Sequence, residues 1–329
     1  MLDHMRSYMR IAERLLAEDY EIPAAYADAR NVIFVGMGGS GAAGDIIRDL
    51  TDYQVRIPVD VRGRPDLPAF AGEDSLVVAV SYSGNTFETL SSLDEAMSRH
   101  CKIIGVTSGG RMKETLAKHQ VPRIDLPAGY QPREAMPFML FPMLKVFKQF
   151  GWCQEDVDVA GLDSTREGIE KLAEKIAPRL SGKLAVIYSE YRSVCHRFKS
   201  QINENAKAPA KYDVVTELFH NEVNSWNAMR NFHAILLRDS EERRDIHDVI
   251  EIAKRLLDGS NYTEVLVEGT NRSTRILYMV WLGDFVSYYL ARQNGVDPEK
   301  VPAIDYIKNE LSSLREKTKA KEADRAKVL

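Results

Sequence analysis

The chain alternates short runs of consecutive apolar residues with longer stretches in which apolar residues recur every three or four positions. In the first half, the short runs predict buried strands over 32–35, 55–61, 75–80, 102–108 and 123–127. The longer stretches predict helices over 2–17, 41–50, 87–99, 111–119 and 137–150. Strands and helices in this order indicate right-handed crossovers on a parallel sheet.

The same pattern returns in the second half, after a Pro- and Gly-containing break at 127–137 and a polar segment, 151–164, which we interpret as a linker. Strands are predicted over 183–189, 232–239 and 262–269. Helices are predicted over 164–180, 191–207, 241–259 and 271–292. Ser164 is a predicted N-cap, with Glu167 as its capping-box partner.

The predicted fold class is therefore α/β, with two subdomains that each contain a parallel β-sheet flanked by α-helices. We place the subdomains at residues 1–152 and 153–329, the second with a C-terminal helix. The charge-dense tail, 312–329, is expected to be a solvated helix end or disordered.

Composition supports an ordinary globular protein. Of 329 residues, 44% are hydrophobic and 28% charged, which fits two domains. The net charge of −4 gives no basic excess for a nucleic acid or an anionic membrane surface. Cys101, Cys153 and Cys195 are odd in number and form no CxxC pair, so a reducing cytoplasm is the simplest interpretation. The most apolar helix, 276–291, is too short to span a bilayer and contains Asp284, so we expect it to be buried.

The first candidate site is the turn GMGGSG, residues 36–41, between a strand and a helix. Its glycines allow a ligand to approach the backbone, and the helix start offers free N–H groups to an anion. Gly36, Gly38 and Gly41 also match the dinucleotide pattern GxGxxG, with Asp60 near the position of a ribose-binding acid. A nicotinamide enzyme and a tight turn without a ligand both remain alternatives.

The second candidate site is the turn SYSGNT, residues 81–86, which follows the strand 75–80. Ser81, Ser83 and Thr86 offer neutral hydroxyl donors beside the N–H groups of a helix start, and the turn has no lysine. This set suits a terminal phosphate monoester. A cap by Thr86 would explain only one of the three hydroxyls, and Thr89 stands where a capping box needs Glu or Gln.

Five motifs in chain order resemble one family. They are GMGGSG (36–41), SYSGNT (81–86), PREAMP (132–137), NENAK (203–207) and FHNEVNSW (219–226). The set resembles the bifunctional phosphoglucose/phosphomannose isomerases, which belong to the sugar-isomerase (SIS) domain proteins, from about residue 32 to 309. The resemblance implies two SIS subdomains and a homodimer whose active site takes a histidine from the neighbouring subunit. It also implies conversion of glucose 6-phosphate or mannose 6-phosphate to fructose 6-phosphate without a redox cofactor or a metal.

Roles follow from the resemblance, residue by residue. Ser81, Ser83 and Thr86 would hold the phosphate. Gly39 and Ser40 would contact the sugar.

The catalytic roles that the resemblance implies fall on four residues. Glu204 would be the base that moves a proton between C2 and C1 through a cis-enediol(ate), and Arg133 would stabilise the enediolate charge. His220, sixteen residues after Glu204, would assist ring opening, although His233 and His247 compete as structural histidines. The family's C-terminal lysine would be Lys308, with Lys300 as its rival; Arg292 is no substitute, because a guanidinium does not donate protons at neutral pH.

Two other functions remain open at this stage. A nicotinamide-dependent oxidoreductase would use GMGGSG and have no use for the hydroxyl turn. A non-catalytic SIS sensor of sugar phosphates would have no reason to keep Glu204 and His220 at this spacing.

Overall fold

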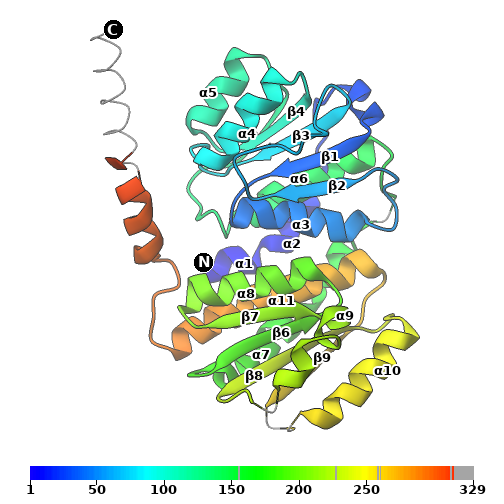
Figure 1. Cartoon of the computed structure of the whole chain (residues 1–329), viewed down its shortest axis with the longest axis vertical. Helices are drawn as coiled ribbons and strands as arrows, with labels where there is room; N and C mark the ends of the chain where they lie inside the picture. The colour runs from blue at the N-terminus through cyan, green and yellow to red at the C-terminus, as the bar shows by residue number, and fades with distance from the viewer. Residues whose placement is uncertain (155, 227, 258, 260, 312, 315–329) are drawn as a thin grey trace.

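The computed structural model describes residues 1–154, 156–226, 228–257, 259, 261–311 and 313–314. It confirms the predicted α/β class, with two sheets flanked by helices and stacked one above the other (Figure 1). Every strand pair in both sheets is parallel. The boundary at residues 152 and 153 stays a prediction, and the charged tail lies outside the described residues except for 313–314.

The first sheet has the strand order β2-β1-β3-β4-β5. Its strands are β1 (Asn31–Val35), β2 (Val59–Arg62), β3 (Ser75–Val80), β4 (Lys102–Thr107) and β5 (Arg123–Asp125). Val35 of β1 pairs with Ala79 of β3, so GMGGSG and SYSGNT leave the same edge of the sheet side by side. The chain reverses its direction across the sheet between these strands, and such a switch point is where ligands bind in open α/β sheets.

The second sheet has the order β7-β6-β8-β9. Its strands are β6 (Leu184–Ser189), β7 (Ala210–Val214), β8 (Phe232–Asp239) and β9 (Tyr262–Val267). Strand β7 was not predicted. It is an edge strand whose five residues are all half-buried, so neither an apolar run nor a clear alternation marks it in the sequence.

The helices form three layers around the sheets. Between the sheets, α3 packs against α8, α2 against α7, and α11 against both α7 and α8. Helices α4 and α5 cover the outer face of the first sheet, and α9 and α10 that of the second (Figure 1). The bounds are α1 (Leu2–Arg6), α2 (Tyr8–Ala17), α3 (Gly39–Thr51), α4 (Phe87–Ser98), α5 (Gly110–Lys118), α6 (Met136–Gln149), α7 (Val159–Leu180), α8 (Arg192–Ala206), α9 (Val215–Leu218), α10 (Arg244–Ala253) and α11 (Arg272–Gln293). Short 3-10 helices span η1 (Ala24–Asp28), η2 (Glu222–Ser225) and η3 (Lys254–Leu256).

Several predicted helix boundaries were wrong, and a side-chain hydrogen bond explains two of them. The predicted helix 2–17 is divided at Ser7, whose hydroxyl donates to the His4 carbonyl (2.7 Å) and ends α1. Helix α7 begins inside the predicted linker, because Asp158 caps it by accepting from the Gly161 N–H (2.8 Å). Ser164 is not the cap; it lies inside the helix and donates to the Gly161 carbonyl.

The most apolar helix lies in the core between the sheets. Asp284 is 1% exposed within α11, and its buried surroundings agree with the expectation for this helix. Among the described residues, no helix combines the length and the apolar character that crossing a membrane requires.

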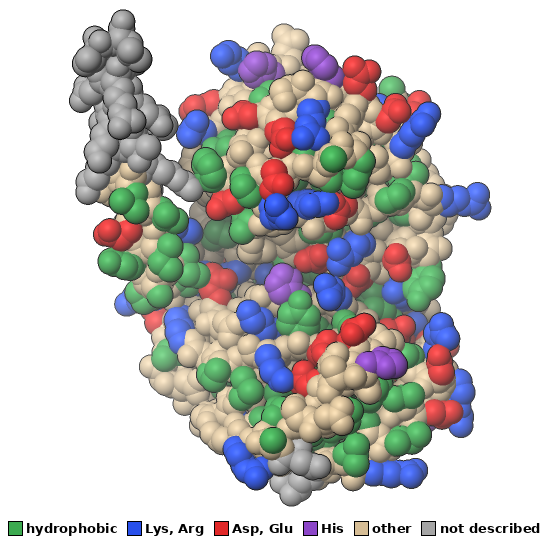
Figure 2. All heavy atoms as spheres, viewed as in Figure 1, with side chains coloured by type: hydrophobic (Ala, Val, Ile, Leu, Met, Phe, Trp, Pro, Cys, Tyr) green, Lys and Arg blue, Asp and Glu red, His purple; other side chains and the backbone are tan. Residues whose placement is uncertain are grey.

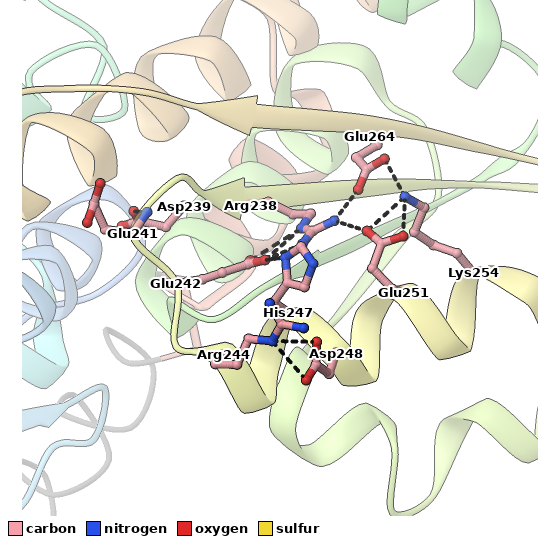
Figure 3. Close-up of polar contacts among 10 residues, drawn as sticks. All are labelled: Arg238, Asp239, Glu241, Glu242, Arg244, His247, Asp248, Glu251, Lys254 and Glu264. Atoms are coloured by element: carbon pink, nitrogen blue, oxygen red, sulfur yellow. Dashed lines mark hydrogen bonds and ion pairs between the residues drawn. The ribbon is translucent and has the colours of Figure 1, made fainter.

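The second sheet carries a network of charged side chains around a buried arginine (Figure 3). Arg238 on β8 is 6% exposed and donates to Glu242, to Glu251 (2.6 Å) and to Glu264 of β9 (2.5 Å). Lys254 joins Glu251 to Glu264 at 3.1 and 2.7 Å. A buried guanidinium is tolerated when carboxylates satisfy it, so this network fastens α10 to the sheet.

Candidate active site

The turn GMGGSG joins β1 to α3 and brings the helix start against the segment that contains Arg133. Gly38 has φ of +55°, and the helix begins at Gly39, two residues before the predicted start. A Cβ on Gly39 would lie 2.9 Å from the carbonyl oxygen of Pro132, so a larger residue would push the two segments apart. The glycine at this position therefore sets the close approach between α3 and Arg133.

The hydroxyl turn encloses the start of α4. Ser81 is 1% exposed; its hydroxyl donates to Thr86 Oγ1 (3.1 Å) and accepts from the Gly84 N–H (3.1 Å). Ser83 is exposed and accepts from the Asn85 N–H (3.3 Å). Thr86 occupies the N-cap position without a side-chain cap bond, so a capping role does not account for its hydroxyl.

Ser40 connects the two turns. Its hydroxyl accepts from the Tyr82 N–H (3.4 Å) and donates to Met139 Sδ (3.4 Å). Ser40 is 6% exposed, so it fixes the spacing of the turns from beneath. The structure thus brings Gly39, Ser40 and the three hydroxyls to one edge of the first sheet.

Arg133 is buried between the two halves of the protein and is 2% exposed. Its Nη1 donates to Glu204 Oε1 (3.1 Å), and its Nε donates to Asn205 Oδ1 (2.8 Å). Its Nη2 donates to the carbonyls of Pro298 (2.7 Å) and Glu299 (2.8 Å), which follow α11. The structure therefore joins two predicted residues that lie 71 positions apart.

Glu204 lies in the last turn of α8 and faces a cavity of about 280 Å³ between α8 and α3. Its side chain is 28% exposed, which leaves the carboxylate accessible from the cavity. Gly38, Gly39 and Gly41 form the opposite wall. A carboxylate, a fixed guanidinium and a glycine-walled cavity together suit the removal of a proton from a carbon next to a carbonyl.

The cavity also contains residues that the sequence analysis did not assign to a site. Arg197, Gln201, Ser200 and His196 line it from α8. Among them is His196, whose Nδ1 lies 3.3 Å from Oδ2 of Asp45, which also lines the cavity. The signal was in the spacing, because His196, Ser200 and Glu204 recur every four residues on one helical face.

Two residues that were predicted to belong to the site lie outside the cavity. His220 is exposed in the turn after α9, and it is not among the residues that line the cavity. Lys308 is exposed on a further helix, residues 302–311, which stands away from the two sheets (Figure 1). Lys300 lies beside Asp297, with Nζ 3.7 Å from Oδ2, in the segment that precedes this helix.

The alternative of a nicotinamide enzyme requires Asp60 to bind a ribose, but this carboxylate is already paired with an arginine. Asp60 on β2 accepts from Arg62 Nε at 2.6 Å. Its carboxylate is thus paired within the chain instead of being directed toward GMGGSG. The nicotinamide function is not favoured.

Comparison with known proteins identifies both halves of the chain. Residues 25–142 match the SIS domain, and residues 169–311 match the family described as the bacterial phospho-glucose isomerase C-terminal SIS domain. The solved glucosamine-6-phosphate deaminase of Thermotoga maritima superposes with a TM-score of 0.68 at 16% identity, over 92% of this chain and 97% of that one. At this identity the likeness concerns the fold alone.

Curated relatives extend over most of the chain. The bifunctional phosphoglucose/phosphomannose isomerase of Caldicellulosiruptor bescii is 34% identical over 310 residues, which covers 88% of this chain and 91% of that protein. The enzyme of the same name from Aquifex aeolicus is 35% identical over 86% of this chain and 90% of its own length. On this similarity, the chain belongs to the bifunctional phosphoglucose/phosphomannose isomerase family.

Proposed function

We propose that this protein interconverts glucose 6-phosphate and mannose 6-phosphate with fructose 6-phosphate. The observation that carries the proposal is the 3.1 Å contact between Arg133 and Glu204, whose carboxylate faces the glycine-walled cavity. Family membership supports the same reaction, because the relatives are named for both activities. The activity is that of an aldose–ketose isomerase.

The reaction needs one base and one cation at adjacent carbons. In the opened aldose, Glu204 removes the proton from C2; the electron pair of that bond forms a C1=C2 double bond, and the carbonyl pair moves onto O1 as the enediolate oxygen. Arg133 lies beside the carboxylate and stabilises this negative charge. The proton on O2 then passes to O1, C2–O becomes the carbonyl, and the C1=C2 pair takes the proton back from Glu204 at C1. Glucose and mannose differ only at C2, which is planar in the enediolate, so in the reverse direction return of the proton to one face or the other of C2 gives one epimer or the other.

The hydroxyl turn holds the other end of the substrate. Ser81, Ser83 and Thr86 present hydroxyls where the N–H groups of α4 also start, and both groups donate to phosphate oxygens. Gly39 lines the cavity with Glu204, and its neighbour Ser40 bonds to Tyr82 of the hydroxyl turn, so the carbon chain of the sugar would run past these two residues. Phosphate binding at one end therefore fixes C1 and C2 at the other.

A second copy of the chain completes the site in this proposal. His220 is exposed, and helix 302–311 carries exposed apolar side chains at Ile304 (39%), Ile307 (56%) and Leu311 (44%). Figure 2 shows hydrophobic side chains on the surface of this helix. Apolar residues with this spacing form a face that needs a packing partner. A homodimer would cover this face and could bring the partner's His220 to the cavity, where it assists ring opening; Lys308 would act from the same helix.

The cysteines support a reducing compartment, and we place the protein in the cytoplasm. The structure joins none of Cys101, Cys153 and Cys195 in a disulfide, and burial raises the pKa of Cys195 and of Cys101. A raised pKa keeps these last two thiols protonated and poorly reactive.

Fructose 6-phosphate is expected to give both glucose 6-phosphate and mannose 6-phosphate when incubated with the purified protein in EDTA. The two products can be followed separately by coupled dehydrogenase assays or by NMR. A sugar-phosphate sensor would bind the ketose without forming either product. A requirement for added metal would contradict the base mechanism, because Glu204 and Arg133 supply its proton transfer and its charge stabilisation.

A mixture of two inactive variants tests the shared site. Glu204→Gln and His220→Ala chains, co-expressed with different tags, are each expected to be inactive or severely impaired alone. A mixed dimer restores one intact site if His220 acts on the partner's cavity, which gives about one quarter of wild-type activity after random assembly. Recovery that stays at the level of the separate variants would show that His220 does not act across the dimer.

A further inference from the structure

A buried ion pair lies directly behind Arg133. Arg197 of α8 and Asp284 of α11 are 2% and 1% exposed in their side chains. The guanidinium binds the carboxylate through two atoms, with Nε–Oδ1 and Nη2–Oδ2 distances of 3.1 Å each. Gln201 Nε2 donates to the same Asp284 Oδ1 at 2.8 Å. Asp284 is the one acidic residue of the apolar stretch 276–291.

Stability alone does not account for the pair. Removing two charges from water costs several kcal/mol per ion, and apolar replacements of buried pairs are often neutral or stabilising. Burial raises the pKa of Asp284, against the opposing effect of Arg197. We therefore look for a role of the ion pair in the residues that it contacts, and not in its own contribution to stability.

Two series of hydrogen bonds, here called arms, lead from this region to Arg133, and the first holds its main chain. Arg197 Nη2 also donates to the Arg133 carbonyl oxygen at 2.8 Å. Each hydrogen of Nη2 thus has a separate acceptor, one on Asp284 and one on Arg133. The bidentate pair prevents the guanidinium from rotating away from that carbonyl.

The other arm fixes the side chain of Arg133. Arg133 Nε donates to Asn205 Oδ1 (2.8 Å), and Asn205 Nδ2 donates to Ser287 Oγ (2.9 Å). Ser287 in turn donates to the Asp284 carbonyl oxygen (2.7 Å). The ion pair thus holds the backbone of Arg133, while α11 holds its guanidinium through Asn205 and Ser287.

We propose that Arg197 and Asp284 are positioning residues, which hold Arg133 in the orientation that places its Nη1 against Glu204. The inference rests on the proposed isomerase function and deepens it. The two arms meet at the Arg133–Glu204 contact, because Asn205 is the immediate neighbour of Glu204 on α8. Neither arm reaches the hydroxyl turn, so the phosphate-binding end of the site is independent of this network.

The test replaces the pair with apolar residues of similar size, in the double variant Arg197→Met/Asp284→Leu. We expect this variant to fold and to bind fructose 6-phosphate within about threefold of the wild type, while kcat falls about 10²-fold, the loss that a misplacement of 1 Å can cause. A crystal structure should show the Arg133 guanidinium displaced from Glu204. Wild-type kcat in a folded double variant would overturn the proposal.

A matched control and a milder variant keep the outcome interpretable. Arg6→Met/Glu170→Leu removes another ion pair (2.5 Å) of the central layer, neither residue of which lines the cavity, and should leave kcat within about twofold. An equal loss in this control would assign the effect to general packing and overturn the proposal. If the double variant fails to fold, Arg197→Lys keeps a positive charge beside Asp284 but removes the Nη2 that donates to the Arg133 carbonyl, and an unchanged kcat there would overturn it too.

The isomerase function and the positioning role fail in different ways. If the wild-type protein converts no fructose 6-phosphate, the proposed function is wrong. The position of Arg133 in the crystal structure of the double variant then still decides whether the ion pair positions it.

Discussion

Replacing Glu204 by glutamine is expected to lower kcat for fructose 6-phosphate by about 10²- to 10⁴-fold, the contribution of a positioned general base. Glutamine has the same shape and keeps an oxygen that can accept from Arg133 Nη1, so the site should remain assembled. The amide cannot take the C2 proton. Because the phosphate is held at a separate turn, the affinity for fructose 6-phosphate should stay within about threefold, measured by calorimetry.

The matched control is Glu217→Gln, on α9, an exposed glutamate outside the cavity. It makes the same chemical change and should keep wild-type kcat. Turnover by Glu204→Gln within tenfold of wild type would assign the base to another residue. Loss of ligand binding together with turnover would instead mean that Glu204 holds the substrate.

Replacing Arg133 by lysine is expected to lower kcat by about 10²- to 10³-fold, the loss found when one donor to a developing oxyanion is removed. The charge is kept, but the ammonium cannot reproduce the fork that contacts Glu204, Asn205 and the carbonyls of Pro298 and Glu299 at once. The cation would no longer be fixed beside the enediolate. Steady-state kinetics with either product assay would measure the loss.

Arg64→Lys is the control for this substitution. Arg64 is 66% exposed and binds Asp66 at the surface, so the same change should leave kcat unaltered. Thermal unfolding of both variants would separate lost catalysis from lost structure. A kcat for Arg133→Lys within twofold of wild type would show that the fork geometry is not needed for charge stabilisation.

The position of the two turns could be predicted from the sequence because it is local. GMGGSG and SYSGNT each follow a strand directly, and their glycines and hydroxyls lie within six residues. Neighbouring strands then bring the two turns together, as the parallel α/β pattern already implied. Errors occurred where local signals compete, as at the start of α7, where Asp158 rather than Ser164 makes the cap.

Residues assembled from distant segments were less predictable. Arg133 and Glu204 were linked by resemblance alone, since no local pattern states that a loop after β5 meets the end of α8. His196 was overlooked because its partner Asp45 lies 151 positions earlier in the chain. Asp284 was noted only as an interruption of an apolar helix, and its ion pair with Arg197 is invisible without the packing of α8 on α11.

The sequence by itself determined the alternation of strands and helices, the two turns that follow β1 and β3, and the candidate side chains for proton transfer. These properties depend on periodicity and on residue type over a few positions. Only the tertiary structure decided that Arg133 is buried against Glu204 and that its carbonyl accepts from Arg197, the partner of Asp284, while His220 and Lys308 stay outside the cavity. The physical reason is that contact and burial are set by the packing of helices against one another, which brings together residues with no common local signal.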